Sequence, residues 1–144
     1  MKKVIVLSRV STEGQDLTQQ TDEVLREVYK DGYTDSNIII IEDKESAIQL
    51  SEEERHGLNK MKEYISTNPN INCVYIYELS RLSRIPLVLY SIRDYLVERR
   101  IQLICLKPYF RLLEVDGTMS QTGSLMFSLF SSLAESEMIL KKER

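Results

Sequence analysis

The sequence predicts an α/β domain with a mostly parallel central sheet of four to five strands, helices on both faces, and a long C-terminal helix. Short apolar runs that are typical of buried strands alternate along the chain with amphipathic stretches that are typical of helices. The strand runs are continuously apolar, as in parallel sheets covered on both faces. The 144 residues are enough for one such domain with its own core.

The first half of the chain contains two strand-helix pairs. The predicted elements are a strand at 4–7, a helix at 17–29, a strand at 38–41 and a helix that begins at 51. Gly32 lies just past the first helix, where helices often end. Ser51 and Glu54 form a capping-box pattern at the start of the second helix. The core face of that helix would contain Leu58, Met61 and Ile65.

The second half repeats this order and ends in a helix. The predicted elements are a strand at 73–77, a helix that begins at Pro86, a strand at 101–106, a short edge strand or irregular segment at 109–115, and a helix at 119–144. Arg99 and Arg100 would place positive charge in the last turn of the middle helix. Asp116 and Gly117 predict a turn before the last helix.

Composition excludes several classes of protein. A net charge of −3 is unlike a dedicated nucleic-acid-binding module, although positive charge can still be focused in one cleft. The sequence has no apolar run long enough to span a bilayer and no signal-peptide pattern, so we expect a cytoplasmic protein. Cys73 and Cys105 lie in apolar runs and are expected to be buried free thiols. His56, the one histidine, has no ligand partner at metal-binding spacing, so no metal site is expected.

A serine and an arginine follow the first apolar run, in the segment Arg9-Val10-Ser11-Thr12. Parallel α/β sheets usually carry their active sites at this carboxyl edge of the strands. Arg9 can hold an anion and the hydroxyl of Ser11 can attack one, which favours phosphoryl transfer. The alternative is a turn or helix cap. A Ser-His-Asp hydrolase is disfavoured because the single histidine is distant in sequence.

A second group of cations follows the third predicted strand, in Leu79-Ser80-Arg81-Leu82-Ser83-Arg84. Arg81 and Arg84 would lie on one side of a helical turn, at the same sheet edge as Arg9. Guanidinium groups bind phosphate oxygens in bidentate fashion. The alternative is a set of capping and surface arginines. Arg55 follows three glutamates, so an ion pair within a helix is its alternative interpretation.

Together these segments resemble the catalytic domain of the serine recombinases, the resolvase and invertase family. Residues 9–12 are similar to the family's nucleophile motif, and residues 79–84 to its Leu-Asp-Arg-Leu-x-Arg motif. The other matching positions are Gln15, Gln20, Glu45-Ser46-Ala47 followed by Arg55 and Leu58, and the segment from Ala134-Glu135-Ser136-Glu137 to Glu143-Arg144. Ser80 departs from the family, which usually has an aspartate there.

The resemblance implies a resolvase-like fold and site-specific recombination of double-stranded DNA without a metal or other cofactor. Ser11 would attack a phosphodiester and form a 5′-phosphoserine intermediate, followed by strand exchange and religation. The catalytic arginines would be Arg9, Arg55, Arg81 and Arg84. Substrate-binding residues would be Gln15, Gln20 and Ser80.

The resemblance also implies an assembly. Residues 1–117 would be the catalytic domain, and 118–144 the start of a long helix that leads to a DNA-binding region beyond this sequence. Homodimers would join into a tetramer on DNA through an apolar stripe formed by Leu125, Met126, Leu129, Phe130 and Leu133. The alternative for this stripe is a helix packed in the domain core. A bacterium, a phage or a mobile element would encode such a protein.

Two functions from other classes remain open at this stage. One is a catalytically impaired α/β regulatory or assembly domain, in which Ser80 marks lost activity. The other is a phosphate- or nucleotide-binding domain that uses the arginine edge.

Overall fold

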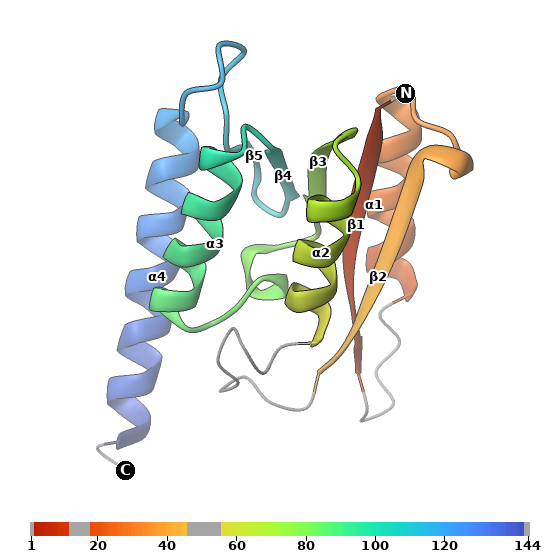
Figure 1. Cartoon of the computed structure of the whole chain (residues 1–144). Coiled ribbons are helices and arrows are strands. Elements are labelled where there is room, and N and C mark those ends of the chain that lie inside the picture. Colours follow the sequence, from red (N-terminus) through yellow and green to blue (C-terminus); the bar gives the residue numbers. More distant parts are fainter. Residues whose placement is uncertain (1, 12–17, 46–55, 143–144) are drawn as a thin grey trace.

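The computed structural model describes residues 2–11, 18–45 and 56–142. In these ranges the strands form one five-stranded sheet in the order β2-β1-β3-β4-β5, parallel except for β5 (Figure 1). The strands are β1 (Lys3–Ser11), β2 (Ile38–Glu45), β3 (Ile71–Ile76), β4 (Gln102–Leu106) and β5 (Tyr109–Arg111). The helices are α1 (Thr18–Lys30), α2 (His56–Thr67), α3 (Pro86–Glu98) and α4 (Gln121–Lys142), with 3₁₀ turns η1 (Asp35–Asn37) and η3 (Leu79–Arg81). The predicted fold class is confirmed.

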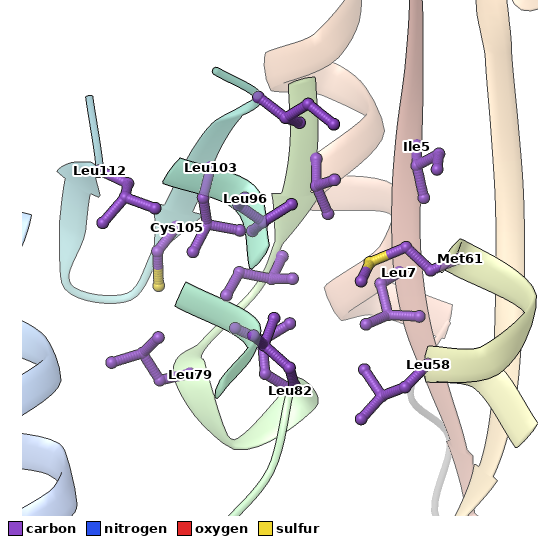
Figure 2. Close-up of a cluster of buried hydrophobic side chains, with 14 of the residues drawn as sticks. Ile5, Leu7, Leu58, Met61, Leu79, Leu82, Leu96, Leu103, Cys105 and Leu112 are labelled. Atoms are coloured by element: carbon purple, nitrogen blue, oxygen red, sulfur yellow. The ribbon is translucent and has the colours of Figure 1, made fainter. Parts of the chain in front are cut away.

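Each face of the sheet has its own core because side chains alternate between the faces along a strand. Val4 and Val6 of β1 pack with Val24 and Val28 of α1 on one face. The core on the other face is larger. This face is covered by α2 and α3, with α4 packed against α3 and β5. Figure 2 shows the buried side chains on this face, which include the predicted Leu58 and Met61.

The strands β1 and β2 extend further than their apolar runs. Their parallel register continues from Val4 beside Ile38 to Ser11 beside Glu45. Backbone hydrogen bonding does not require apolar side chains. The paired strands therefore continue past the apolar runs 4–7 and 38–41, from which the strands were predicted. As a result, Ser11 is the last residue of β1.

The end of α3 corrects the prediction for Arg99 and Arg100. The helix ends at Glu98, and Arg100 has a left-handed φ of 55°. The N–H of Arg100 donates to the carbonyl of Val97, and the N–H of Ile101 to that of Leu96. This is a Schellman motif, and it turns the chain into β4. Both arginines therefore lie past the last turn of the helix.

The segment 109–115 contains a short edge strand, which settles the alternative left open by its sequence. β5 pairs antiparallel with β4, and α4 begins two residues later than predicted. The Ser120 hydroxyl caps this helix: it accepts from the N–H of Gly123 at 2.9 Å and donates to the carbonyl of Arg111 at 2.6 Å. A Cβ on Gly123 would lie 3.0 Å from the Cα of Leu112, so glycine permits this close approach.

The N-terminus of the second helix cannot be compared with its prediction, because Ser51 and Glu54 lie outside the described residues. Across the described part of the chain, no helix combines the length and the apolar character needed to cross a membrane.

Candidate active site

The carboxyl ends of β1 and β3 meet at one edge of the sheet. β1 ends at Ser11, and η3, which follows β3, contacts β1. In the backbone register, Arg9 lies beside Asp43 of β2 and Ser11 lies beside Glu45. The structure describes the backbone of these residues and not their side chains. The fold thus places the predicted serine and the second arginine segment at the same edge, as the sequence predicted.

Arg81 is a buried cation with two described partners. The residue is 8% exposed, which is unusual for an arginine. Its Nη2 donates to Oε1 of Gln20 at 2.6 Å and lies 3.2 Å from Oε1 of Glu78. Gln20 lies in the first turn of α1. This hydrogen bond therefore joins the start of α1 to the segment after β3 and fixes the direction of the guanidinium.

A small cleft lies beside this guanidinium. Its lining residues are Val6, Leu7, Ser8, Gln20, Thr21, Val24, Tyr77 and Arg81. The Ser8 and Thr21 hydroxyls share a hydrogen bond of 2.5 Å, which closes β1 against α1 three residues before Ser11. The wall of the cleft combines a cation, an amide and hydroxyls, which are groups that can bind phosphate oxygens.

Ser80 is buried and is bonded within the protein. It is 4% exposed, and its hydroxyl donates to Oε1 of Glu78 at 2.6 Å. Glu78 was not predicted as a site residue, although it contacts both Ser80 and Arg81. A sequence signal existed: an acid stands two positions before the serine that occupies the family's usual aspartate position.

The other predicted site residues are less closely defined. Arg84 is half-buried between η3 and α3. Gln15 and Arg55 lie outside the described residues. Among the predicted residues whose side chains are described, the structure brings Gln20 and Arg81 into direct contact. Ser80 is linked to Arg81 through Glu78, whose carboxylate contacts both residues.

The apolar stripe of α4 divides into two sides. Leu125, Leu129 and Leu133 are exposed, at 54%, 50% and 65%. They recur every four residues and so form a row along the helix. Met126 and Phe130 are half-buried and pack against the core. An exposed row of large apolar side chains on a helix is typical of a surface that contacts a partner.

Both cysteines are buried free thiols, as predicted. Burial raises the pKa of the Cys105 thiol from 9.0 to about 12, and burial also raises the pKa of Cys73. Among the described residues, no group of three or more His, Cys, Asp or Glu side chains is arranged to hold a metal ion.

The chain matches one protein family and several solved structures. A family model described as the resolvase N-terminal domain matches residues 4–144. The N-terminal catalytic domain of TP901-1 integrase is similar with a TM-score of 0.67 and 26% identity, covering 96% of this chain and 98% of that one. A resolvase family site-specific recombinase from Streptococcus pneumoniae shares the fold, with a TM-score of 0.60 and 24% identity over 99% of this chain and 91% of that one. None of the curated protein sequences gives a significant match.

The family match spans nearly the whole chain and includes the strand that ends at Ser11 and the segment that carries Arg81. The TM-scores of 0.67 and 0.60 show that the chain shares the overall fold of these two solved structures. The chain belongs to the resolvase family and has the fold of a serine recombinase catalytic domain.

Proposed function

We propose that this chain is the catalytic domain of a site-specific DNA recombinase that cuts and rejoins double-stranded DNA through Ser11. The Ser11 oxygen loses its proton and bonds to a backbone phosphorus, while the bond from phosphorus to the 3′ oxygen breaks and that oxygen takes up a proton. The product is a 5′-phosphoserine ester and a free 3′ hydroxyl. Attack by a 3′ hydroxyl of another strand reverses these steps and restores Ser11.

The observation that carries this proposal is the buried guanidinium of Arg81 near the edge where β1 ends at Ser11. Burial of an arginine is costly unless it is paired and hydrogen-bonded. This one is held by Gln20 and Glu78 before any substrate arrives. A cation fixed in advance stabilises charge that develops in a transition state, because it needs no reorganisation during the reaction.

The remaining site residues complete the proposed phosphate site. Arg9, Arg55 and Arg84 would act together with Arg81 to stabilise the negative charge on the oxygens of the five-coordinate phosphorus. Gln20 uses its carbonyl oxygen toward Arg81, which leaves its amide N–H groups as donors for a phosphate oxygen. Gln15 is proposed as a neutral group that positions the substrate, and Ser80, whose hydroxyl donates to Glu78, is proposed to act on the substrate indirectly through that carboxylate. The electron and proton balance of the exchange needs no cofactor.

Recombination of two duplex sites requires four strand cuts, so we propose a homodimer that pairs into a tetramer on DNA. The interface would be the α4 stripe of Leu125, Met126, Leu129, Phe130 and Leu133, of which three side chains are exposed. We further propose that residues 1–117 carry the chemistry, that 118–144 begin the linking helix, and that a segment beyond Arg144 supplies most base contacts.

The test is recombination by the full-length gene product with and without the Ser11 hydroxyl. The DNA sites would first be recovered by incubating the protein with sheared DNA from its host, denaturing the mixture and sequencing fragments that stay attached to protein. We expect Ser11→Ala to abolish both attachment and recombination, and Thr12→Ala, which removes the neighbouring hydroxyl, to retain both. Recombination by the Ser11→Ala variant would refute the assignment. Absence of attachment in the parent would favour a phosphate-binding domain.

A further inference from the structure

We infer that Glu78 is a positioning residue for Arg81, and that it supplies from residue 78 the carboxylate that residue 80 lacks. The inference rests on the proposed function and assigns a role to a residue that the sequence motifs do not single out. Three contacts on neighbouring atoms support it.

The first two contacts converge on one carboxylate oxygen. Oε1 of Glu78 accepts from the Ser80 hydroxyl at 2.6 Å and lies 3.2 Å from Nη2 of Arg81. Ser80 therefore fixes the carboxylate, and the carboxylate fixes the guanidinium. The serine thus supports an acid that lies two residues before it in the chain.

The third contact is made by the backbone. The carbonyl of Glu78 accepts from the N–H of Arg81 at 3.0 Å, as the first hydrogen bond of η3. Glu78 thus restrains Arg81 at both ends, through its carbonyl at the backbone and through its carboxylate at the guanidinium. Gln20 holds the same Nη2 from the α1 side at 2.6 Å, so this nitrogen is placed between two acceptors from separate elements.

The two partners of the ion pair differ in their exposure to solvent. The Arg81 side chain is 9% exposed and the Glu78 side chain is 37% exposed. A pair at this boundary is desolvated enough to hold a geometry, while the carboxylate keeps part of its hydration and so costs less to maintain as an ion. Loss of the carboxylate would remove a charged partner of the buried guanidinium and one of the contacts that set its direction.

The experiment compares single-turnover formation of the covalent protein–DNA adduct in four full-length proteins: the parent, Glu78→Gln, Glu78→Gln with Ser80→Asp, and Glu98→Gln. The double variant places a carboxylate next to the position of the lost one, because Oγ of Ser80 lies 2.6 Å from Oε1 of Glu78. Glu98→Gln is the matched control, since Glu98 also faces an arginine, Arg99 at 3.9 Å, in a mostly exposed pair. DNA affinity and Tm are measured for each.

We expect Glu78→Gln to slow adduct formation by about tenfold, which corresponds to about 1.4 kcal/mol, with DNA affinity within about twofold of the parent. The double variant should recover at least half of that loss, and Glu98→Gln should react like the parent. A merely structural role would lower Tm without rescue by a relocated charge. The inference is overturned if Glu78→Gln reacts like the parent, or if Ser80→Asp restores nothing. Absence of adduct in the parent would instead overturn the proposed function.

Discussion

The hydrogen bond between Gln20 and Arg81 predicts a kinetic effect whose size follows from the usual strength of hydrogen bonds to charged groups. Replacing Gln20 by Leu keeps the approximate volume of the side chain and removes the acceptor that lies 2.6 Å from Nη2 of Arg81. Hydrogen bonds to charged groups contribute about 1.5–3 kcal/mol. If that contribution fixes Arg81 for the transition state, and about 1.4 kcal/mol equals a factor of ten, adduct formation should slow by about 10–150-fold.

The assay is single-turnover adduct formation by the full-length protein at saturating enzyme, resolved on denaturing gels. Gln19→Leu is the matched control, since Gln19 is the adjacent glutamine and is exposed. Circular dichroism establishes that each variant is folded at the assay temperature. The reasoning is refuted if Gln20→Leu and Gln19→Leu react at the same rate, because the contact that orients Arg81 would then have no role in the chemistry.

Three other predictions concern assembly, packing and the thiols. Leu129→Lys, at a 50% exposed position, should weaken self-association in sedimentation experiments while the exposed neighbour change Ser128→Lys does not; equal effects would exclude the α4 row as the interface. Gly123→Ala gains about 1 kcal/mol of helix propensity but meets backbone at 3.0 Å, so Tm should fall by about 2–4 °C, and a rise would contradict the close packing. Cys73 and Cys105 should react with a thiol reagent at pH 8 far more slowly in the folded than in the unfolded protein, because both thiols are buried; equal labelling rates would contradict burial. Burial raises the pKa of Cys105 to about 12, so the contribution of the protonated Cys105 thiol to the free energy of unfolding should be present below pH 9 and be lost as the pH rises toward 12.

Most of the sheet could be predicted from the sequence because its strands are continuous apolar runs. The ends of the strands could not. β1 extends to Ser11 because its backbone pairs with β2, a property of two segments together that no window around 4–7 contains. The end of α3 was missed for a related reason: Arg100 adopts a left-handed φ that sequence rules reserve mainly for glycine and asparagine.

The candidate site, like the fold, could be predicted only in part from the sequence. Arg81 was predicted from its motif, and its place at the carboxyl edge of β3 is confirmed. Its contact with Gln20 joins residues 61 positions apart, so only the resemblance to a family suggested that both belong to one site. Glu78 was missed because its significance depends on side-chain directions: an acid two residues before a serine acquires a role only once η3 folds both toward Arg81.

The central claim is that Ser11 is the nucleophile, and the most direct measurement is the location of the nucleotide in the covalent complex. The trapped adduct is digested with nuclease and protease, and the modified peptide is sequenced by tandem mass spectrometry. The account predicts a nucleotide joined through its 5′ phosphate to the oxygen of Ser11. A nucleotide attached to any other side chain, or joined through a 3′ phosphate, would contradict it.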